Sequence, residues 1–141
     1  MRVTMLITQR NQYAIRAVFE LAKRRDQGLT KIADIAAAQK IPVRFLEVIL
    51  VQLKRSGIVA SKRGCYGGYS LKRAPDKLTV GDILRYMETD SPLHCISCID
   101  KDDCELKGSC AFLPMWNEAQ QAMLDVLDRT TIQKLLDNPT L

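Results

Sequence analysis

Hydrophobic residues recur every three or four positions along most of the chain, which is the spacing of helices with one buried face. This spacing predicts helices over residues 11–25, 30–38, 42–55, 79–88 and 112–128. The last of these alternates steps of three and four residues, which gives a narrow apolar seam typical of helix pairing. The expected seam residues are Trp116, Ala119, Met123 and Val126. A short final helix is predicted after Thr131.

Residue types at the expected helix ends support these boundaries. Thr30 is expected to cap the second helix, and Pro42 suits the first turn of the third. Gly57 fits the left-handed position that ends the third helix. Thr79, with Asp82 three residues later, has the pattern of a capping box. The residues of the third helix expected to point inward are Phe45, Leu46, Ile49, Leu50 and Leu53.

Two short β-prone runs, 58–62 and 69–72, flank a glycine-rich loop and predict a hairpin. Three helices followed by such a hairpin predict a winged helix-turn-helix, whose third helix enters the major groove of DNA. The predicted fold class is therefore mainly α with a small β-hairpin: a winged helix-turn-helix plus a long C-terminal dimerisation helix. The expected parts are a DNA-binding domain (1–90), a cysteine-rich loop (91–111) and a dimerisation helix with a C-terminal turn (112–141).

The charge is divided unevenly along the 141 residues. Residues 1–75 carry 15 Lys and Arg against 4 Asp and Glu, a net charge of +11, whereas residues 76–141 carry a net charge of −6. A helical hairpin in a protein-binding domain would show the same pattern of elements, but here both elements that would touch DNA are basic. We therefore expect double-stranded DNA as the partner. The expected DNA-binding residues are Arg44, Lys54, Arg55, Lys62, Arg63, Gly64, Tyr69 and Lys72.

Different contacts are expected from these residues. Arg44, near the start of the third helix, is suited to guanine recognition by paired hydrogen bonds. Arg63 and Gly64 lie at the tip of the hairpin, where arginine reads a narrow minor groove and glycine allows close approach of the backbone. Phosphate contacts are expected from Lys62, Tyr69 and Lys72.

Four of the five cysteines lie within sixteen residues, in the pattern C-x2-C-x5-C-x5-C. They are Cys95, Cys98, Cys104 and Cys110. Clustered thiols in a polar stretch favour a soft metal centre, such as zinc, copper(I) or an iron–sulfur cluster, over a core role. Disulfides or idle thiols are the alternatives. The absence of a secretory signal or a membrane-spanning run predicts a soluble protein of the cytoplasm, whose reducing conditions disfavour disulfides.

Several short motifs together resemble a known family. The strongest is Phe45-Leu46-Glu47 followed by residues 53–59, and the others are residues 13–17, 32–36, 62–64, 67–71 and 130–132. The chain resembles the small winged-helix repressors that include the iron–sulfur cluster regulator IscR, the nitric-oxide-sensing repressor NsrR and the cysteine metabolism repressor CymR. This resemblance extends over nearly the whole chain.

The resemblance implies a set of cluster ligands. In relatives that hold a cluster, three cysteines spaced x5 and x5 supply the thiolates, and these match Cys98, Cys104 and Cys110. The fourth ligand is a histidine in the IscR type and a carboxylate of the partner subunit in the NsrR type, but these positions are Leu113 and Gln12 here. The expected substitutes are Cys95 first and His94 second, while Cys65 in the hairpin is interpreted as structural or incidental.

The function implied is a homodimeric transcriptional regulator, a repressor, that binds a pseudo-palindromic operator under the control of a 2Fe-2S or 4Fe-4S cluster. The cluster would sense redox state, nitric oxide or iron–sulfur status. The alternatives are a constitutive regulator with a structural zinc on the four cysteines, or a small iron–sulfur electron carrier. An enzyme is not expected, because the single histidine has no converging nucleophile, acids or phosphate loop beside it.

Overall fold

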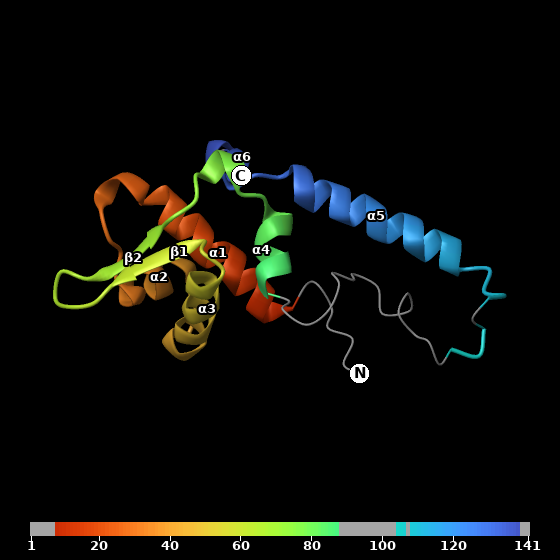
Figure 1. The fold of residues 1–141 in the computed structure, drawn as a ribbon, viewed down its shortest axis with the longest axis horizontal. Coiled ribbons are helices and arrows are strands. Elements are labelled where there is room, and N and C mark those ends of the chain that lie inside the picture. The colour runs from red at the N-terminus through yellow and green to blue at the C-terminus, as the bar shows by residue number, and fades with distance from the viewer. Residues whose placement is uncertain (1–7, 88–103, 107, 139–141) are drawn as a thin grey trace.

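The helices and the hairpin expected from the sequence are present in the expected order. The computed structural model describes residues 8–87, 104–106 and 108–138. The elements are α1 (Gln9–Lys23), η1 (Arg25–Gln27), α2 (Ile32–Gln39), α3 (Val43–Arg55), β1 (Val59–Lys62), β2 (Gly68–Leu71), η2 (Pro75–Lys77), α4 (Val80–Met87), α5 (Leu113–Arg129) and α6 (Ile132–Asp137). The hairpin and helices α1–α4 and α6 gather into one body, from which α5 extends (Figure 1). Within the described residues, no helix is long and apolar enough to cross a membrane.

Helix α1 is the centre of the hydrophobic core and contacts α2, α3, α4, α6 and β2. Its buried positions Ala14, Ala17 and Val18 are small, so that neighbouring helices can approach closely. Helix α6 returns to this body and buries Ile132 completely. The core therefore joins the winged helix and the C-terminal end of the chain into one unit.

The hairpin is tied to α2 by a backbone bridge. Strands β1 and β2 pair antiparallel, with Val59 opposite Leu71, and Thr30 forms a separate bridge with Tyr69 through two 2.8 Å backbone hydrogen bonds. The prediction that Thr30 caps α2 was therefore wrong: Lys31 is the N-cap residue and makes no side-chain capping bond. Glycine is required at position 67, because a Cβ there would lie 2.1 Å from the Lys62 carbonyl oxygen.

The capping predictions for the later helices are confirmed. The Asp82 amide donates to the Thr79 hydroxyl at 3.0 Å, and the Thr79 amide donates to the Asp82 carboxylate at 3.1 Å. The Thr131 hydroxyl accepts from the Lys134 amide at 3.1 Å at the start of α6. Pro42 lies one position earlier than expected, as the N-cap of α3 rather than in its first turn.

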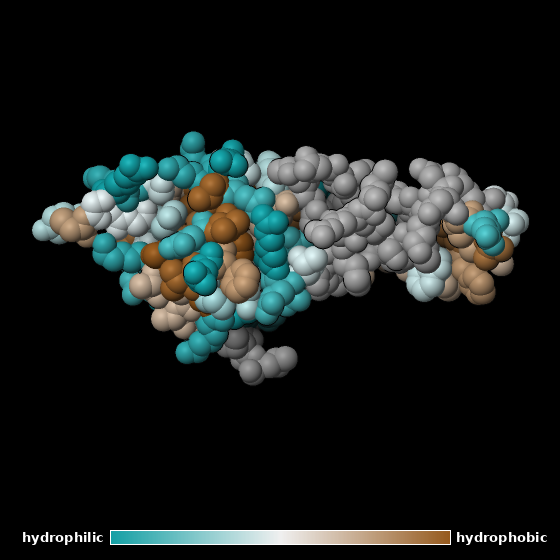
Figure 2. Space-filling model, turned by 90° about the horizontal axis from the view of Figure 1, so that it is seen from below, coloured by the Kyte–Doolittle hydropathy of each residue, from teal (hydrophilic) through white to brown (hydrophobic). Residues whose placement is uncertain are grey.

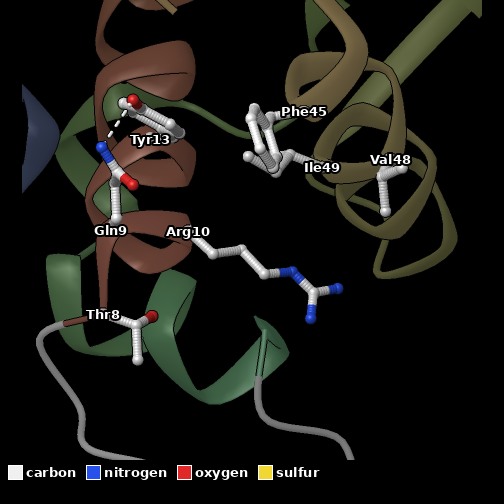
Figure 3. Close-up of a pocket in the computed structure, with 7 residues that line it drawn as sticks. All are labelled: Thr8, Gln9, Arg10, Tyr13, Phe45, Val48 and Ile49. Atoms are coloured by element: carbon white, nitrogen blue, oxygen red, sulfur yellow. Dashed lines mark hydrogen bonds between the residues drawn. The ribbon is translucent and has the colours of Figure 1, made fainter. Parts of the chain in front are cut away.

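Phe45 does not point into the core as predicted, since its side chain is 61 % exposed. Its ring instead lies 6.4 Å from the ring of Tyr13 on α1, and the Arg16 guanidinium lies over the Tyr13 ring at 5.4 Å. These aromatic residues border an open groove of about 410 Å³ between the start of α1 and α3 (Figure 3). Phe45 therefore lies at the rim of the core, with most of its surface exposed to solvent.

Glu20 is a buried acid that connects α1 to α2, with only 3 % of its surface exposed. Its carboxylate accepts from Arg24 at 2.5 Å and from Gln39 at 2.8 Å. Burial by itself raises the pKa of Glu20, but hydrogen bonds from Gln39 and Arg24 and the charges of Arg24 and Lys23 outweigh it, so that the pKa lies below its ordinary value. The ionised form of Glu20 thus stabilises the fold.

Replacing Glu20 with Ala is expected to lower the free energy of unfolding by about 2–4 kcal/mol, because two hydrogen bonds to a charged group are lost inside the protein. Glu20→Gln keeps the shape and is expected to cost less. Since the pKa of Glu20 is lowered in the folded protein, the stabilisation that ionised Glu20 provides is complete above the unfolded pKa of about 4.5. This stabilisation is lost as the pH falls through the folded pKa. Chemical unfolding of the parent and Glu20→Gln between pH 3 and 7 tests this. A stability difference that stays constant over that range contradicts it.

Candidate DNA-binding surface and cysteine loop

Helix α3 has one face in the core and one face in solvent. Leu46, Ile49, Leu50 and Leu53 are buried against α1 and the hairpin. The basic residues Arg44, Lys54 and Arg55 are all exposed. This division leaves the charged face of α3 free to meet a partner.

A shallow basic groove lies between α3 and the hairpin. Its volume is about 220 Å³. The lining residues are Leu50, Val51 and Lys54 of α3, with Ser61, Lys62, Arg63, Gly68 and Tyr69 of the hairpin. The fold thus brings four of the eight predicted DNA-binding residues to one concave surface. Arg44, Arg55, Gly64 and Lys72 are not part of its lining, although each is exposed.

The tip of the hairpin is held toward α2. The Gly67 amide donates to the Gly64 carbonyl at 2.9 Å, and Gly64 adopts a φ of +109°, which favours glycine. The Lys31 ammonium donates to the Cys65 carbonyl at 2.8 Å. Arg63 and Cys65 are exposed on this tip, so the predicted wing residues are accessible to a large ligand.

Only part of the cysteine loop lies in the described residues. Cys104 is exposed and Cys110 is half-buried, and both are free thiols. Between them the Ser109 amide donates to the Leu106 carbonyl at 3.0 Å, and Gly108 has a φ of +90°, as in a turn that reverses the chain. Among the described residues no group of three or more His, Cys, Asp or Glu side chains converges. The predicted ligands Cys95, Cys98 and His94 lie outside the described residues.

The two positions that the resemblance assigns to a fourth ligand carry no thiolate, imidazole or carboxylate here. Leu113 is half-buried at the start of α5, and its side chain has no donor atom. Gln12 is exposed on α1 and carries a neutral amide in place of a carboxylate. The expectation that Cys95 or His94 supplies the fourth ligand stays a prediction.

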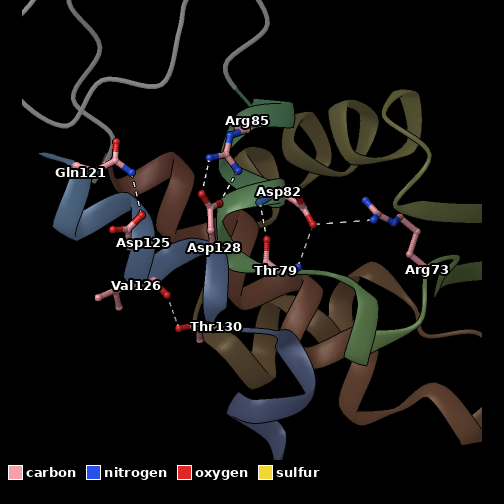
Figure 4. A network of polar contacts seen from close by, with 9 residues as sticks. All are labelled: Arg73, Thr79, Asp82, Arg85, Gln121, Asp125, Val126, Asp128 and Thr130. Carbon is pink, nitrogen blue, oxygen red and sulfur yellow. Dashed lines mark hydrogen bonds and ion pairs between the residues drawn. The ribbon is translucent and has the colours of Figure 1, made fainter.

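A polar junction between residues far apart in the sequence joins α4 to the end of α5 (Figure 4). The Arg85 guanidinium donates twice to the Asp128 carboxylate, at 2.5 and 2.8 Å. These hydrogen bonds raise the pKa of Arg85 and lower that of Asp128. A Cβ on residue 81 would lie 1.9 Å from the Asp128 carboxylate oxygen, so Gly81 is what allows α5 to come this close.

Backbone contacts reinforce the same junction. Thr79 and Thr131 form an isolated antiparallel bridge, in which the Val80 amide donates to the Thr130 carbonyl at 2.9 Å. The Ile132 amide donates to the Leu78 carbonyl, also at 2.9 Å. The C-terminal end of α5 is therefore attached to the winged-helix body on two sides.

No residue of α5 is buried, although the helix is 17 residues long and rich in apolar side chains. Met123, Leu124 and Leu127 are half-buried against the core of the body. Met123 of the predicted seam therefore packs within its own protomer. Fewer seam residues are then available for contact with a partner. The exposed apolar residues of α5 are Met115, Trp116, Ala119, Ala122 and Val126.

A helix-turn-helix beside a basic hairpin is the architecture of winged-helix DNA-binding proteins, and similarity to known proteins agrees. The profile of the Rrf2 family, described as an iron-dependent transcriptional regulator, matches residues 7–138. The chain belongs to the Rrf2 family.

Individual relatives are similar over most of their length. The rrf2-like HTH-type transcriptional regulator of Rhodobacter capsulatus is 37 % identical over 141 residues, covering 93 % of this chain and 92 % of that protein. The HTH-type transcriptional regulator IscR of Erwinia tasmaniensis is 30 % identical, covering 95 % and 80 %. The structure of CymR, the global cysteine regulator of Bacillus subtilis, is 32 % identical with a TM-score of 0.75, covering 95 % and 98 %.

These similarities confirm the predicted family, and with it a helix-turn-helix transcriptional regulator rather than an enzyme. They leave the regulatory signal open, because one family includes both IscR and a protein described as a global cysteine regulator.

Proposed function

We propose that this chain is a homodimeric repressor that binds a pseudo-palindromic DNA operator in the cytoplasm, under the control of its cysteine loop. The observation that carries the proposal is the basic groove shared by α3 and the hairpin, where Lys54, Lys62 and Arg63 line one concave surface. A phosphate backbone fits such a surface, because each neutralised phosphate releases counterions.

The positions of the basic residues support a different type of DNA contact for each group of them. Arg44, exposed at the start of α3, reads guanine in the major groove, while Lys54 and Arg55 continue along the same helix. Lys62, Tyr69 and Lys72 of the hairpin hold phosphates. Arg63 and Gly64 at the tip enter the minor groove.

Arg44→Ala and Arg63→Ala are each expected to weaken operator binding by roughly 1–3 kcal/mol, by different routes. Loss of Arg44 is expected to relax sequence preference at one base pair, because a base-reading contact disappears. Loss of Arg63 is expected to lessen preference for a narrow minor groove. Binding curves at physiological salt against the operator and its single-base variants measure both effects.

Lys77→Ala is the matched control, because Lys77 is an exposed cation on η2, which packs against α6 and does not line the basic groove. Its affinity for the operator is expected to equal that of the parent. Parent-like affinity of the Arg44 and Arg63 variants as well would show that this surface is not the DNA-binding surface.

The exposed apolar face of α5 supports the proposed dimer. Met115, Ala119, Ala122 and Val126 follow one another at steps of four, three and four residues, so they form one stripe along the helix. A second copy of this stripe is the partner that a two-fold operator requires. Pairing along α5 would leave both α3 helices outside the dimer contact.

The metal centre is proposed from donor chemistry. Cys104 and Cys110 are free thiols on either side of a chain-reversing turn, which suits the approach of two thiolates to one metal centre. Cys98 and Cys95 are the further proposed ligands of an iron–sulfur cluster. Such a cluster, when bound, supplies a redox- or nitric-oxide-sensitive iron centre. A structural zinc is the second candidate, since four thiolates also suit zinc.

The position of the loop suggests how control reaches the DNA. It connects α4 of the winged helix to α5, the proposed dimer helix. A change in the charge or the folding of this connection, which reaches the N-terminal end of α5, would alter how the two α5 helices pair and so shift the two DNA-binding bodies relative to one another. Residues that fix the position of the ends of α5 therefore influence the affinity for the operator.

A further inference from the structure

The solvent face of α3 carries two apolar residues among its charges. Val48 and Val51 are 56 % and 49 % exposed, although valine is among the residues most often buried. An α-helix turns by about 100° per residue, so both valines lie within about 40° of Arg44 and opposite the core residue Leu53. The buried face of α3 already completes the core without them.

Two arginines flank these valines on the same face, which also carries the exposed acid Glu47. Arg44 lies four residues before Val48 and Arg55 lies four residues after Val51, so each arginine is a neighbour along the helix surface. Val51 also lines the basic groove together with Lys54 and Lys62. The face of the body that includes α3 shows a hydrophobic area bordered by hydrophilic residues (Figure 2). The complementary partner is thus a polyanion that presents apolar groups between its phosphates.

The major groove of double-stranded DNA has this composition, because thymine places its C5-methyl group there between two phosphate backbones. We propose that Val48 and Val51 contact thymine methyl groups and thereby select A·T base pairs at the centre of each half-site. The proposal rests on the proposed function, in which α3 enters the major groove. Valine discriminates against cytosine, which lacks the methyl group and leaves an amino donor without a partner.

The spacing of the two valines sets which thymines they reach. They are separated by about 4.5 Å along the helix axis, which is comparable with the base-pair step of about 3.4 Å. Neighbouring base pairs therefore supply the two methyl groups. Arg44 and Arg55 then lie beyond the A·T step on either side, where guanines or phosphates are within their reach.

The test begins with operators selected by the full-length protein from random duplexes. Each thymine of a selected operator is replaced in turn with uracil, which removes only the C5-methyl group. Two neighbouring positions in each half-site are expected to lose about fourfold in affinity each, the value of one buried methyl group. Each single variant, Val48→Ala or Val51→Ala, is expected to lose the sensitivity to uracil at one of these two positions and to keep it at the other, since only one of the two contacts is absent.

Val43→Ala is the matched control, because Val43 is 43 % exposed on α3 but lies about 100° away from Arg44 around the helix. This variant is expected to keep the full sensitivity to uracil. Equal binding of thymine and uracil operators at every position would overturn the inference while leaving the proposed function intact. Val48 and Val51 variants that change the oligomeric state and not the sensitivity to uracil would also overturn it. Failure to select any sequence would instead contradict the proposed function itself.

Discussion

Aspartate at positions 119 and 126 is expected to convert the protein into a monomer that no longer binds its operator tightly. Ala119 and Val126 are both exposed in the protomer, so the substitutions leave its own core intact. In a two-fold dimer they would bring like charges into a dry contact, at a cost on the order of several kcal/mol. The dissociation constant of the dimer is expected to rise at least ~1000-fold, measured by sedimentation.

A matched pair of charges elsewhere on α5 separates this effect from simple electrostatic repulsion of DNA. Asn117→Asp with Gln121→Glu adds the same charge on exposed positions across the helix from the proposed seam. This control is expected to remain dimeric and to bind the operator. An Ala119→Asp, Val126→Asp protein that sediments as a dimer would rule out α5 as the contact.

Alanine at Cys98, Cys104 or Cys110 is expected to abolish the proposed iron–sulfur centre, because each removes a thiolate that offsets the charge of iron. The measurement is the iron and sulfide content and visible absorption of protein purified without oxygen. Each variant is expected to be colourless and to hold less than about a tenth of the iron of the parent, the loss set by a missing thiolate ligand. Full loading of Cys104→Ala would exclude this loop as the metal site.

Further single variants distinguish the fourth ligand and the type of metal. Cys95→Ala is expected to be more harmful than Gln12→Ala, since a thiolate binds iron better than a neutral amide does. Cys65→Ala on the exposed wing is the control and is expected to keep the parent spectrum. A colourless parent that contains zinc and no sulfide would favour the structural zinc instead.

The fold could be predicted where the signals are local. The capping box of Thr79 and Asp82 and the cap at Thr131 depend on residues three positions apart, so the sequence displays both partners together. Thr30 carries the same type of local signal, but its backbone pairs with Tyr69, 39 positions later. Tertiary pairing prevailed over local propensity there.

Side-chain environment was harder to predict than the elements. The hydropathy of Phe45 predicts a core position, yet Phe45 lies about 80–140° around α3 from the core leucines and meets Tyr13 at the rim. Val48 and Val51 were missed as surface residues of interest, although apolar residues on the polar face of a basic helix were a visible signal. Arg85 and Asp128, 43 residues apart, had no such signal.

The ligand set of the cysteine loop remains a prediction from spacing and resemblance. Two of its four thiols, Cys104 and Cys110, flank a turn that the glycine at position 108 favours. The sequence could supply the residue types and their order. Which side chain completes the set depends on contacts that no spacing rule determines.

The two-sided attachment of α5 to α4 would fix the distance between the two α3 helices of the proposed dimer. With Arg85 and Asp128 paired beside Gly81, and the Thr79–Thr131 bridge closing the other side, each α3 would be presented at a set distance from the two-fold axis. One extra base pair between half-sites shifts the second by about 3.4 Å and rotates it by ~34° around the DNA. A rigid junction cannot follow that rotation. The protein would then discriminate between promoters by the number of base pairs between their half-sites as strictly as by their base sequence.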